Sequence, residues 1–420
     1  MIDAIRNALR IPDLRKKILF TLGILALYRV GAHIPVPGVD PTAMKDFATG
    51  AGSALGLLNL FAGGALENFA IFALGIMPYI TATIIMQLLQ AVIPTLERWA
   101  KEGESGQRKI TQTARYMTLG IALMESLGLL TLFQAPPSSG GLGVDFNLLT
   151  EIVIIISLIS GTAAIMWMGE LITQRGIGNG MSLMIFASIV SRFPQTIVAS
   201  FRVHPWFMVL VVVISLAVVA AVVFMEGGQR RIPVQYAKRV VGRRVYGGVG
   251  TYIPLKVNGA NVIPIIFASS VLLFPATVAK FFTNVAWLQQ VAAWLSSGWT
   301  YIILFAILIM FFAYFYTALV FNPIETADNL RKNGGFIPGV RPGNPTAQYI
   351  TNVLNRITLP GAVFLALIAV VPQAIFQQTG DQLVAAFGGT SILIMVGVAL
   401  ETMRQLESQL QMRHYDGFFK

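Results

Sequence analysis

Apolar stretches of about 20 residues recur along the whole chain, and they constrain the fold more than any other feature. A helix needs about 20 mostly apolar residues to cross roughly 30 Å of hydrocarbon. Windows of this kind predict ten spans: Ile18–Ile34, Phe69–Ile93, Tyr116–Ala135, Leu148–Leu171, Met181–Ser200, Trp206–Met225, Val262–Ala279, Trp299–Phe321, Ile357–Phe376 and Leu383–Met403. The sequence therefore predicts an all-α, polytopic membrane protein of about ten transmembrane helices.

Composition supports this class and excludes several kinds of chemistry. Charged residues make up 12% of the chain, about half of the roughly 25% found in soluble domains. The absence of cysteine excludes disulfides, thiol catalysis and cysteine metal ligands. His33, His204 and His414 lie far apart, and no Ser/His pair, metal-ligand spacing or P-loop occurs. We therefore expect no enzymatic activity, no metal and no cofactor.

The segments that connect the predicted spans lie alternately on the two sides of the membrane, and Lys and Arg are distributed unequally between these sides. If the amino terminus is cytoplasmic, only Arg29, Lys45, Arg192, Arg202 and Lys280 of the 30 basic residues face the opposite side. Cytoplasmic loops carry the excess of Lys and Arg in membrane proteins. The pattern predicts that both termini are cytoplasmic, and it supports the number of spans.

Ten spans divide after the fifth into an amino-terminal half, residues 1–203, and a carboxy-terminal half, residues 204–420. An odd number of spans in each half places the halves in opposite orientations. This is the inverted-repeat plan of many transport proteins, in which the working site lies between the halves near the midplane. This prediction rests on the number of spans alone.

Two predicted cytoplasmic loops are unusually long and basic. Residues 226–261 alternate basic residues with Val, Tyr and Ile, which predicts a short β-hairpin. Residues 322–349 form a turn-rich loop that contains Arg341. Orientation in the membrane alone would not require ordered loops of this length. We favour docking to an acidic partner, such as RNA phosphate or an acidic protein face.

The stretch from Ser53 to Pro94 is apolar but broken by Gly63, Gly64, Gly75 and Pro78. Irregular backbone at membrane depth is tolerated only where protein or a water-filled cavity surrounds it. The broken entrance therefore favours a channel or a transporter.

Few polar groups lie within the predicted spans. Glu125, in the third span, is the one clear ionisable residue at membrane depth, where such groups are costly and often functional. A proton relay would need several of them, so a structural role for Glu125 is favoured. An inverted-repeat secondary transporter of a small solute is the alternative function, although it would need more convergent polar groups.

Isoleucine pairs recur at helical spacing on two of the spans. Ile80 and Ile84 lie one turn apart on the second span, and Ile185 and Ile189 repeat that spacing on the fifth. Such pairs are ordinary on lipid-facing helices, and they gain meaning only if these helices line a pore.

Five long segments closely resemble the bacterial SecY family, whose members are the central subunits of protein-conducting channels. The segments are GALENFAIFALGIMPYITATIIMQLL (Gly64–Leu89), MWMGELITQRGIGNGMSLMIFASIV (Met166–Val190), KRVVGRRVYGG (Lys238–Gly248), NVIPIIFASSVLLFPATV (Asn261–Val278) and FNPIETADNLRKNGGFIPGVRPG (Phe321–Gly343). The resemblance covers nearly the whole chain, including both basic loops.

The resemblance implies two inverted five-helix halves around an hourglass-shaped central pore. It implies a plug before the second span, formed by Leu57, Leu58, Asn59, Leu60, Phe61, Ala62, Gly63, Gly64, Ala65, Leu66, Glu67 and Asn68. The matching pore-ring residues are Ile80, Ile84, Ile185, Ile189, Ile266 and Ile394. The matching docking residues are Lys238, Arg239, Arg243, Arg244, Lys256 and Arg341. A lateral gate would lie between the second and third spans and the seventh and eighth.

The resemblance also implies partners and a location. SecE and SecG subunits, the SecA motor, the ribosome, secretory preproteins with their signal sequences and membrane lipid would all contact the chain. The expected location is the bacterial cytoplasmic membrane. Physical reasoning agrees, because an apolar ring makes few specific contacts with a passing polypeptide and can gate by dewetting. Gly63 and Gly64 are expected to give the plug a flexible joint, and Glu67 places an unexplained charge in it.

Overall fold

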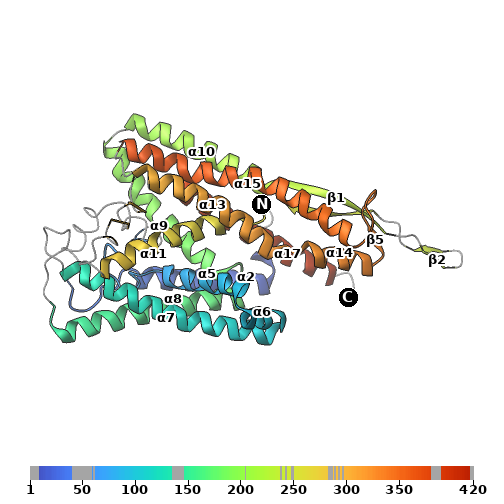
Figure 1. Ribbon diagram of the computed structural model, residues 1–420. Coiled ribbons are helices and arrows are strands. Elements are labelled where there is room, and N and C mark those ends of the chain that lie inside the picture. Colours follow the sequence, from blue (N-terminus) through green and yellow to red (C-terminus); the bar gives the residue numbers. More distant parts are fainter. Residues whose placement is uncertain are drawn as a thin grey trace. The chain divides into compact units, whose positions relative to one another are not determined.

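The computed structural model describes residues 9–39, 59, 62–134, 146–203, 205–236, 239–241, 244–246, 250–281, 287, 290–291, 294–295, 298–379 and 389–416. Its helices are α2 (Pro12–Gly31), α5 (Met77–Val92), α6 (Pro94–Lys101), α7 (Glu104–Gln134), α8 (Leu148–Arg175), α9 (Gly180–Val203), α10 (Pro205–Gly227), α11 (Ile263–Phe281), α13 (Gly298–Val320), α14 (Pro323–Lys332), α15 (Asn344–Thr379) and α17 (Gly389–Asp416) (Figure 1). Its strands are β1 (Gln229–Tyr236), β2 (Arg239–Val241), β3 (Arg244–Tyr246), β4 (Thr251–Lys256) and β5 (Gly335–Phe336). Each of the ten predicted spans overlaps one of these helices.

Among the described residues, three helical stretches are long and apolar enough to cross a membrane by length and composition alone. These are Leu148–Arg175, Gly298–Lys332 and Asn344–Pro372. A fourth span results if α5 and α6 are counted together across their bend of 100°. The shorter apolar helices are Gly180–Pro194, Val212–Gly227 and Ile263–Leu272.

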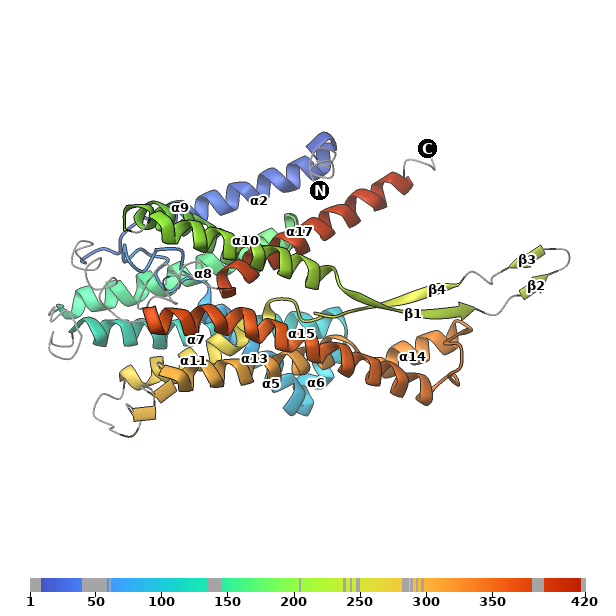
Figure 2. The same ribbon diagram turned by 90° about the horizontal axis from the view of Figure 1, so that it is seen from above.

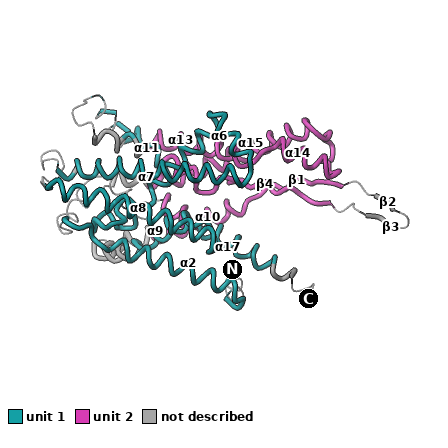
Figure 3. The backbone as a smooth tube through the Cα atoms, turned by 90° about the horizontal axis from the view of Figure 1, so that it is seen from below, with its two compact units in different colours: residues 1–208, 269–301, 398–420 teal, residues 209–268, 302–397 magenta. Residues whose placement is uncertain are grey.

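The chain separates into two compact units (Figure 3). Unit 1 contains Met1–Met208, Ser269–Tyr301 and Val398–Lys420, and unit 2 contains Val209–Ala268 and Ile302–Gly397. The two units are defined by which segments pack together. They do not test whether the amino-terminal and carboxy-terminal halves are related by inverted symmetry. The inverted halves 1–203 and 204–420 therefore stay a prediction.

Unit 1 is a helical bundle in which α7 and α8 are the central elements. Helix α7 packs against α5, α6 and α8, and α8 also packs against α2 and α9. Leu14 on α2, Ile177 in the turn between α8 and α9, and Leu406 on α17 form one buried apolar cluster. The Gly176–Gly180 turn thereby brings the amino-terminal helix and the carboxy-terminal helix together.

Helix α5 begins later and ends more sharply than the apolar window predicts. The predicted span starts at Phe69, whereas α5 starts at Met77. Phe69 and Gly75 have positive φ values of 41° and 59°, which a helix does not accommodate. At the other end Ile93 is extended, with φ −95° and ψ 114°, because it precedes Pro94. The sharp bend between α5 and α6 follows from this proline.

Unit 2 contains the predicted β-hairpin, and the prediction is confirmed. Strands β1 and β4 pair antiparallel from Gln229↔Lys256 to Val234↔Thr251, and β2 pairs with β3 beyond them (Figure 2). Strand β5, from the second basic loop, pairs with the other edge of β1 through Gln235↔Phe336. The two basic loops therefore share one sheet, a relationship that the sequence did not reveal.

The second basic loop is more ordered than the predicted turn-rich segment. Helix α14 starts after Asn322, whose side chain accepts hydrogen bonds from the backbone N–H groups of Ile324 and Glu325 at 3.1 and 3.3 Å. Pro323 at the first helical position favours the same start. Helix α15 already begins at Asn344. A buried apolar core joins these helices to the sheet through Ile232, Val234, Leu255, Leu330, Ile337, Ile350 and Leu354.

Candidate functional site

Asn59 and residues 62–76, called here the loop before α5, include the described part of the predicted plug. Residues 62–76 are mostly turns. Leu57, Leu58, Leu60 and Phe61 lie outside the described residues. Gly63 and Gly64 have φ values of 64° and 86°, which favour glycine strongly. A Cβ at Gly75 would lie 3.0 Å from the Cα of Ala62, so the two chain segments approach closely. The glycines therefore permit a compact loop before α5.

A short antiparallel β-bridge between Pro35 and Ala70 holds the loop near residue 70. The backbone N–H of Val36 donates to the carbonyl of Phe69 at 2.9 Å, and that of Ile71 donates to Ile34 at 3.0 Å. The Phe69 ring is buried and packs edge-on against Phe133 of α7 at 4.9 Å. The residues that follow α2 thus anchor the entrance to α5.

Side chains from α2 and α9 contact the amino end of the loop. The Nη1 group of Arg29 donates to the carbonyl of Gly63 at 2.9 Å. The hydroxyl groups of Tyr28 and Ser188 lie 2.7 Å apart in a buried position. A Cβ at Gly63 would lie 2.9 Å from the Cα of Ser188 and 2.8 Å from the Nη1 of Arg29. Gly63 therefore permits tight packing as well as a positive φ.

Glu67 has partners that the sequence could not assign. Its carboxylate forms an ion pair with Arg192 of α9. It also accepts a hydrogen bond from the Nδ2 group of Asn59 at 2.5 Å, and the backbone N–H of Glu67 donates back to Asn59 Oδ1 at 3.4 Å. The charge in this segment thus has a partner on another helix.

All six predicted ring isoleucines are buried. Ile80 and Ile84 lie one turn apart on α5, and Ile185 and Ile189 lie one turn apart on α9; both helices belong to unit 1. Ile266 on α11 and Ile394 on α17 belong to unit 2. The structure brings these residues together in pairs along helices, and their assembly into one ring stays a prediction.

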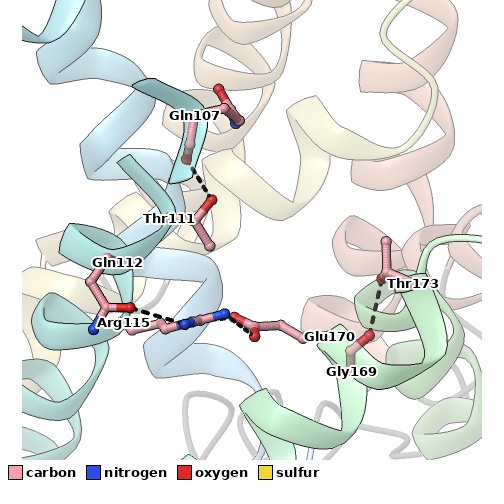
Figure 4. Close-up of polar contacts among 7 residues, drawn as sticks. All are labelled: Gln107, Thr111, Gln112, Arg115, Gly169, Glu170 and Thr173. Carbon is pink, nitrogen blue, oxygen red and sulfur yellow. Dashed lines mark hydrogen bonds and ion pairs between the residues drawn. The ribbon is translucent and has the colours of Figure 1, made fainter. Parts of the chain in front are cut away.

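An ion pair joins α7 to α8 within unit 1 (Figure 4). The Nε of Arg115 donates to Oε1 of Glu170 at 2.8 Å, and Nη2 donates to Oε2 at 2.5 Å. The Nη1 of Arg115 also donates to Gln112 at 2.9 Å.

Glu125, on the same helix α7, is half-buried. Within the described ranges, His, Cys, Asp and Glu form no cluster that could hold a metal ion.

The described docking residues lie on or beside the sheet of unit 2. Lys256 ends β4 and Arg341 follows β5, and both side chains are exposed. The backbones of Arg239 and Arg244 lie in β2 and β3, while Lys238 and Arg243 lie outside the described residues. Exposed Arg230 and Arg231 of β1 add positive charge, and Arg231 lies over the Tyr252 ring at 4.8 Å. Sequence reasoning did not single out either arginine for docking, although both belong to the basic segment 226–261 for which docking was predicted.

Apolar helices long enough to span a membrane, an irregular loop before α5 and a basic sheet define a polytopic all-α membrane protein of the transport class. The SecY family model matches residues 70–403, and relatives match over the full length. The chain belongs to the SecY family.

Relatives with similar sequences carry the name protein translocase subunit SecY. The protein from Streptomyces galbus is 52% identical over 437 residues, and the one from Mycobacterium tuberculosis is 48% identical over 443 residues; both alignments cover 100% of each chain. Among solved structures, a protein-conducting channel matches with a TM-score of 0.67 at 18% identity, covering 93% of this chain and 91% of the other. Canine Sec61 from a ribosome–channel complex matches with a TM-score of 0.61 over the same shares. These structures confirm the predicted fold class.

Proposed function

We propose that this chain is the central subunit of a protein-conducting channel in the bacterial cytoplasmic membrane. It passes unfolded secretory polypeptides across the membrane and releases signal or transmembrane segments sideways into lipid. The observation that carries this proposal is the full-length similarity, at about half identity, to protein translocase subunits. The transporter alternative finds no support in these relatives.

An apolar constriction suits this activity. The proposed ring consists of Ile80, Ile84, Ile185, Ile189, Ile266 and Ile394, whose burial supports a role in closing the resting protein. A polar site would retain some side chains of a passing polypeptide and reject others. Branched apolar side chains make few specific contacts, and a narrow apolar passage excludes water and ions.

The plug closes this constriction in our proposal. The segment from Leu57 to Asn68 is too short to span the membrane. Its described part is held by reversible hydrogen bonds and one ion pair to α2 and α9. Contacts of this kind can break when a polypeptide enters and form again when it leaves.

The basic sheet of unit 2 is the proposed docking surface for a motor or a ribosome. The pairing of β5 with β1 joins both basic loops into one platform on a shared apolar core. Positive charge on a rigid support suits ribosomal RNA or an acidic protein face. Canine Sec61 and yeast Ssh1, two of the matching structures, were solved with ribosomes. SecA supplies the driving force in bacteria in this proposal, and SecE and SecG complete the channel.

Site-specific crosslinking tests the proposed pore. A photo-crosslinking residue at Ile84 or Ile266 should react with a secretory chain stalled during export. The control position is Ile156, which is 60% exposed on α8; it should face lipid and stay unreacted. Equal crosslinking at Ile84 and Ile156 would contradict the pore assignment. Coupled uptake of a small solute by the chain alone would instead revive the transporter alternative.

A further inference from the structure

Two arginines of unit 1 lie where the distribution of charge does not favour them. Arg29 and Arg192 are among the few basic residues predicted on the non-cytoplasmic side. Positive charge is disfavoured in short loops and span ends on that side. Both arginines contact the segment before α5, since Arg29 donates to Gly63 and Arg192 pairs with Glu67. Their position therefore has a specific structural use.

The ion pair between Glu67 and Arg192 is partly shielded from solvent. The side chain of Glu67 is 26% exposed and that of Arg192 is 23% exposed. Charged hydrogen bonds are stronger than neutral ones, and partial burial reduces their screening by salt. Asn59 donates to the same carboxylate oxygen and receives the backbone N–H of Glu67. The carboxylate thus joins two points of the loop to α9.

Apolar burial holds residues 62–68 less than it holds the segment that follows, where the Phe69 ring is buried. Leu66 is the only large apolar side chain in the sequence from residue 62 to residue 68. The free energy of apolar burial scales with the buried area, and alanine and glycine offer little area. The polar contacts of Gly63 with α2 and of Glu67 with α9 are therefore important attachments of residues 62–68.

We propose that the Glu67–Arg192 ion pair, supported by Asn59, is a latch that sets which signal sequences open the channel. The proposal rests on the proposed function, because it assigns a specificity role to the plug of that channel. A signal segment opens the channel only if its binding free energy exceeds the cost of releasing the latch. Weakening the latch shifts the closed–open equilibrium without any change in the signal. Poorly apolar signals should then be accepted.

The first experiment compares export of one reporter behind a strongly apolar and a weakly apolar signal sequence. Glu67→Gln and Arg192→Gln remove the ion pair and should each raise the weak-to-strong export ratio about tenfold, which corresponds to 1.4 kcal/mol. The double variant Glu67→Arg with Arg192→Glu restores an ion pair with reversed polarity. It should return the ratio toward that of the wild type.

The matched control is Glu151→Gln, on α8. Glu151 accepts a hydrogen bond from Gln134 of α7 at 2.6 Å. Among the described residues, no hydrogen bond joins Glu151 to the loop before α5. This variant should keep the wild-type ratio. An unchanged ratio in both single variants, or a reversed pair no closer to wild type than either single variant, would overturn the latch. Failure of the wild type to export the strong signal would instead contradict the proposed function.

A second experiment does not depend on the stability of the charge variants. Because the chain has no cysteine, Glu67→Cys with Arg192→Cys introduces the only two thiols. Joining them with a cleavable bifunctional maleimide should stop export, and cleavage of the linker should restore it. Gln134→Cys with Glu151→Cys, joined in the same way, links α7 to α8 and should leave export unchanged. Export through the linked Glu67–Arg192 pair at the unlinked rate would overturn the proposal.

Discussion

Arg115 and Glu170 join α7 to α8 through two parallel hydrogen bonds of 2.8 and 2.5 Å between guanidinium and carboxylate. The side chain of Glu170 is 13% exposed, and that of Arg115 is 35% exposed. Paired geometry of this kind is the strongest form of charged hydrogen bonding. The contact fixes the relative position of the two central helices of unit 1, which also support the loop before α5.

We expect Arg115→Ala to lower the free energy of unfolding by about 2 kcal/mol, because it leaves the buried carboxylate of Glu170 without its guanidinium partner. Denaturant-induced unfolding in detergent micelles measures this change. The matched control is Arg108→Ala, which removes an exposed ion pair to Glu104 and should cost less than about 0.5 kcal/mol. Equal losses in both variants would contradict the structural role of the Arg115 pair.

Gly63→Ala and Gly64→Ala should differ, although both glycines have positive φ. Each alanine would be strained by about 1–2 kcal/mol in this conformation. Only at Gly63 does the new Cβ also meet the backbone of Ser188 at 2.9 Å, whereas nothing lies within 4 Å at Gly64. Gly63→Ala should therefore increase ion conductance of the resting channel more than Gly64→Ala. Equal conductance would show that tight packing at Gly63 does not help to seal the channel.

The sequence predicted the helices well because each one repeats an apolar pattern along its own length. The ends of the helices were harder to predict. Helix α5 begins at Met77 and not at Phe69, because positive φ values at Phe69 and Gly75 interrupt an apolar stretch that hydropathy treats as continuous. Helix α15 begins well before its apolar span, because its first turns pack on the basic sheet and not in lipid.

Contacts between distant residues were not predictable from local pattern. Arg192 and Glu67 are separated by 125 positions, and Arg115 and Glu170 by 55. A single sequence gives no information on which charges meet. Opposite charges on the same predicted side of the membrane offered a weak signal for Glu67 and Arg192. The pairing of β5 with β1 had no such signal, because β5 is only two residues long.

Ile84→Asn and Ile189→Asn should each raise the ion conductance of the resting channel and allow export behind weak signals. Each places an amide in the proposed apolar ring, where water would then be retained. Planar-bilayer conductance and reporter export measure the two effects. Ile156→Asn, at the exposed position on α8, should leave both unchanged. Wild-type conductance in the two ring variants would exclude these residues from the seal.

Arg341→Glu should abolish export that depends on a motor ATPase while the protein still accumulates in the membrane. Arg341 is exposed and follows β5, and its backbone carbonyl accepts a hydrogen bond from Thr346 at 2.8 Å. The local turn therefore does not need the guanidinium. Arg341→Lys keeps the charge and should retain most of the export activity. Normal export by Arg341→Glu would remove this residue from the docking surface.

Glu125→Gln distinguishes the two functions that the sequence left open. A channel driven from outside needs no ionisable group in its spans, whereas an ion-coupled transporter depends on such groups. The amide occupies nearly the same volume as the carboxylate, and the Glu125 side chain is half-buried on α7. We therefore expect wild-type rates of reporter export in membranes that contain only the variant. Loss of export at normal protein levels would show that Glu125 titrates or binds an ion during transport, and the passive channel mechanism would then be wrong.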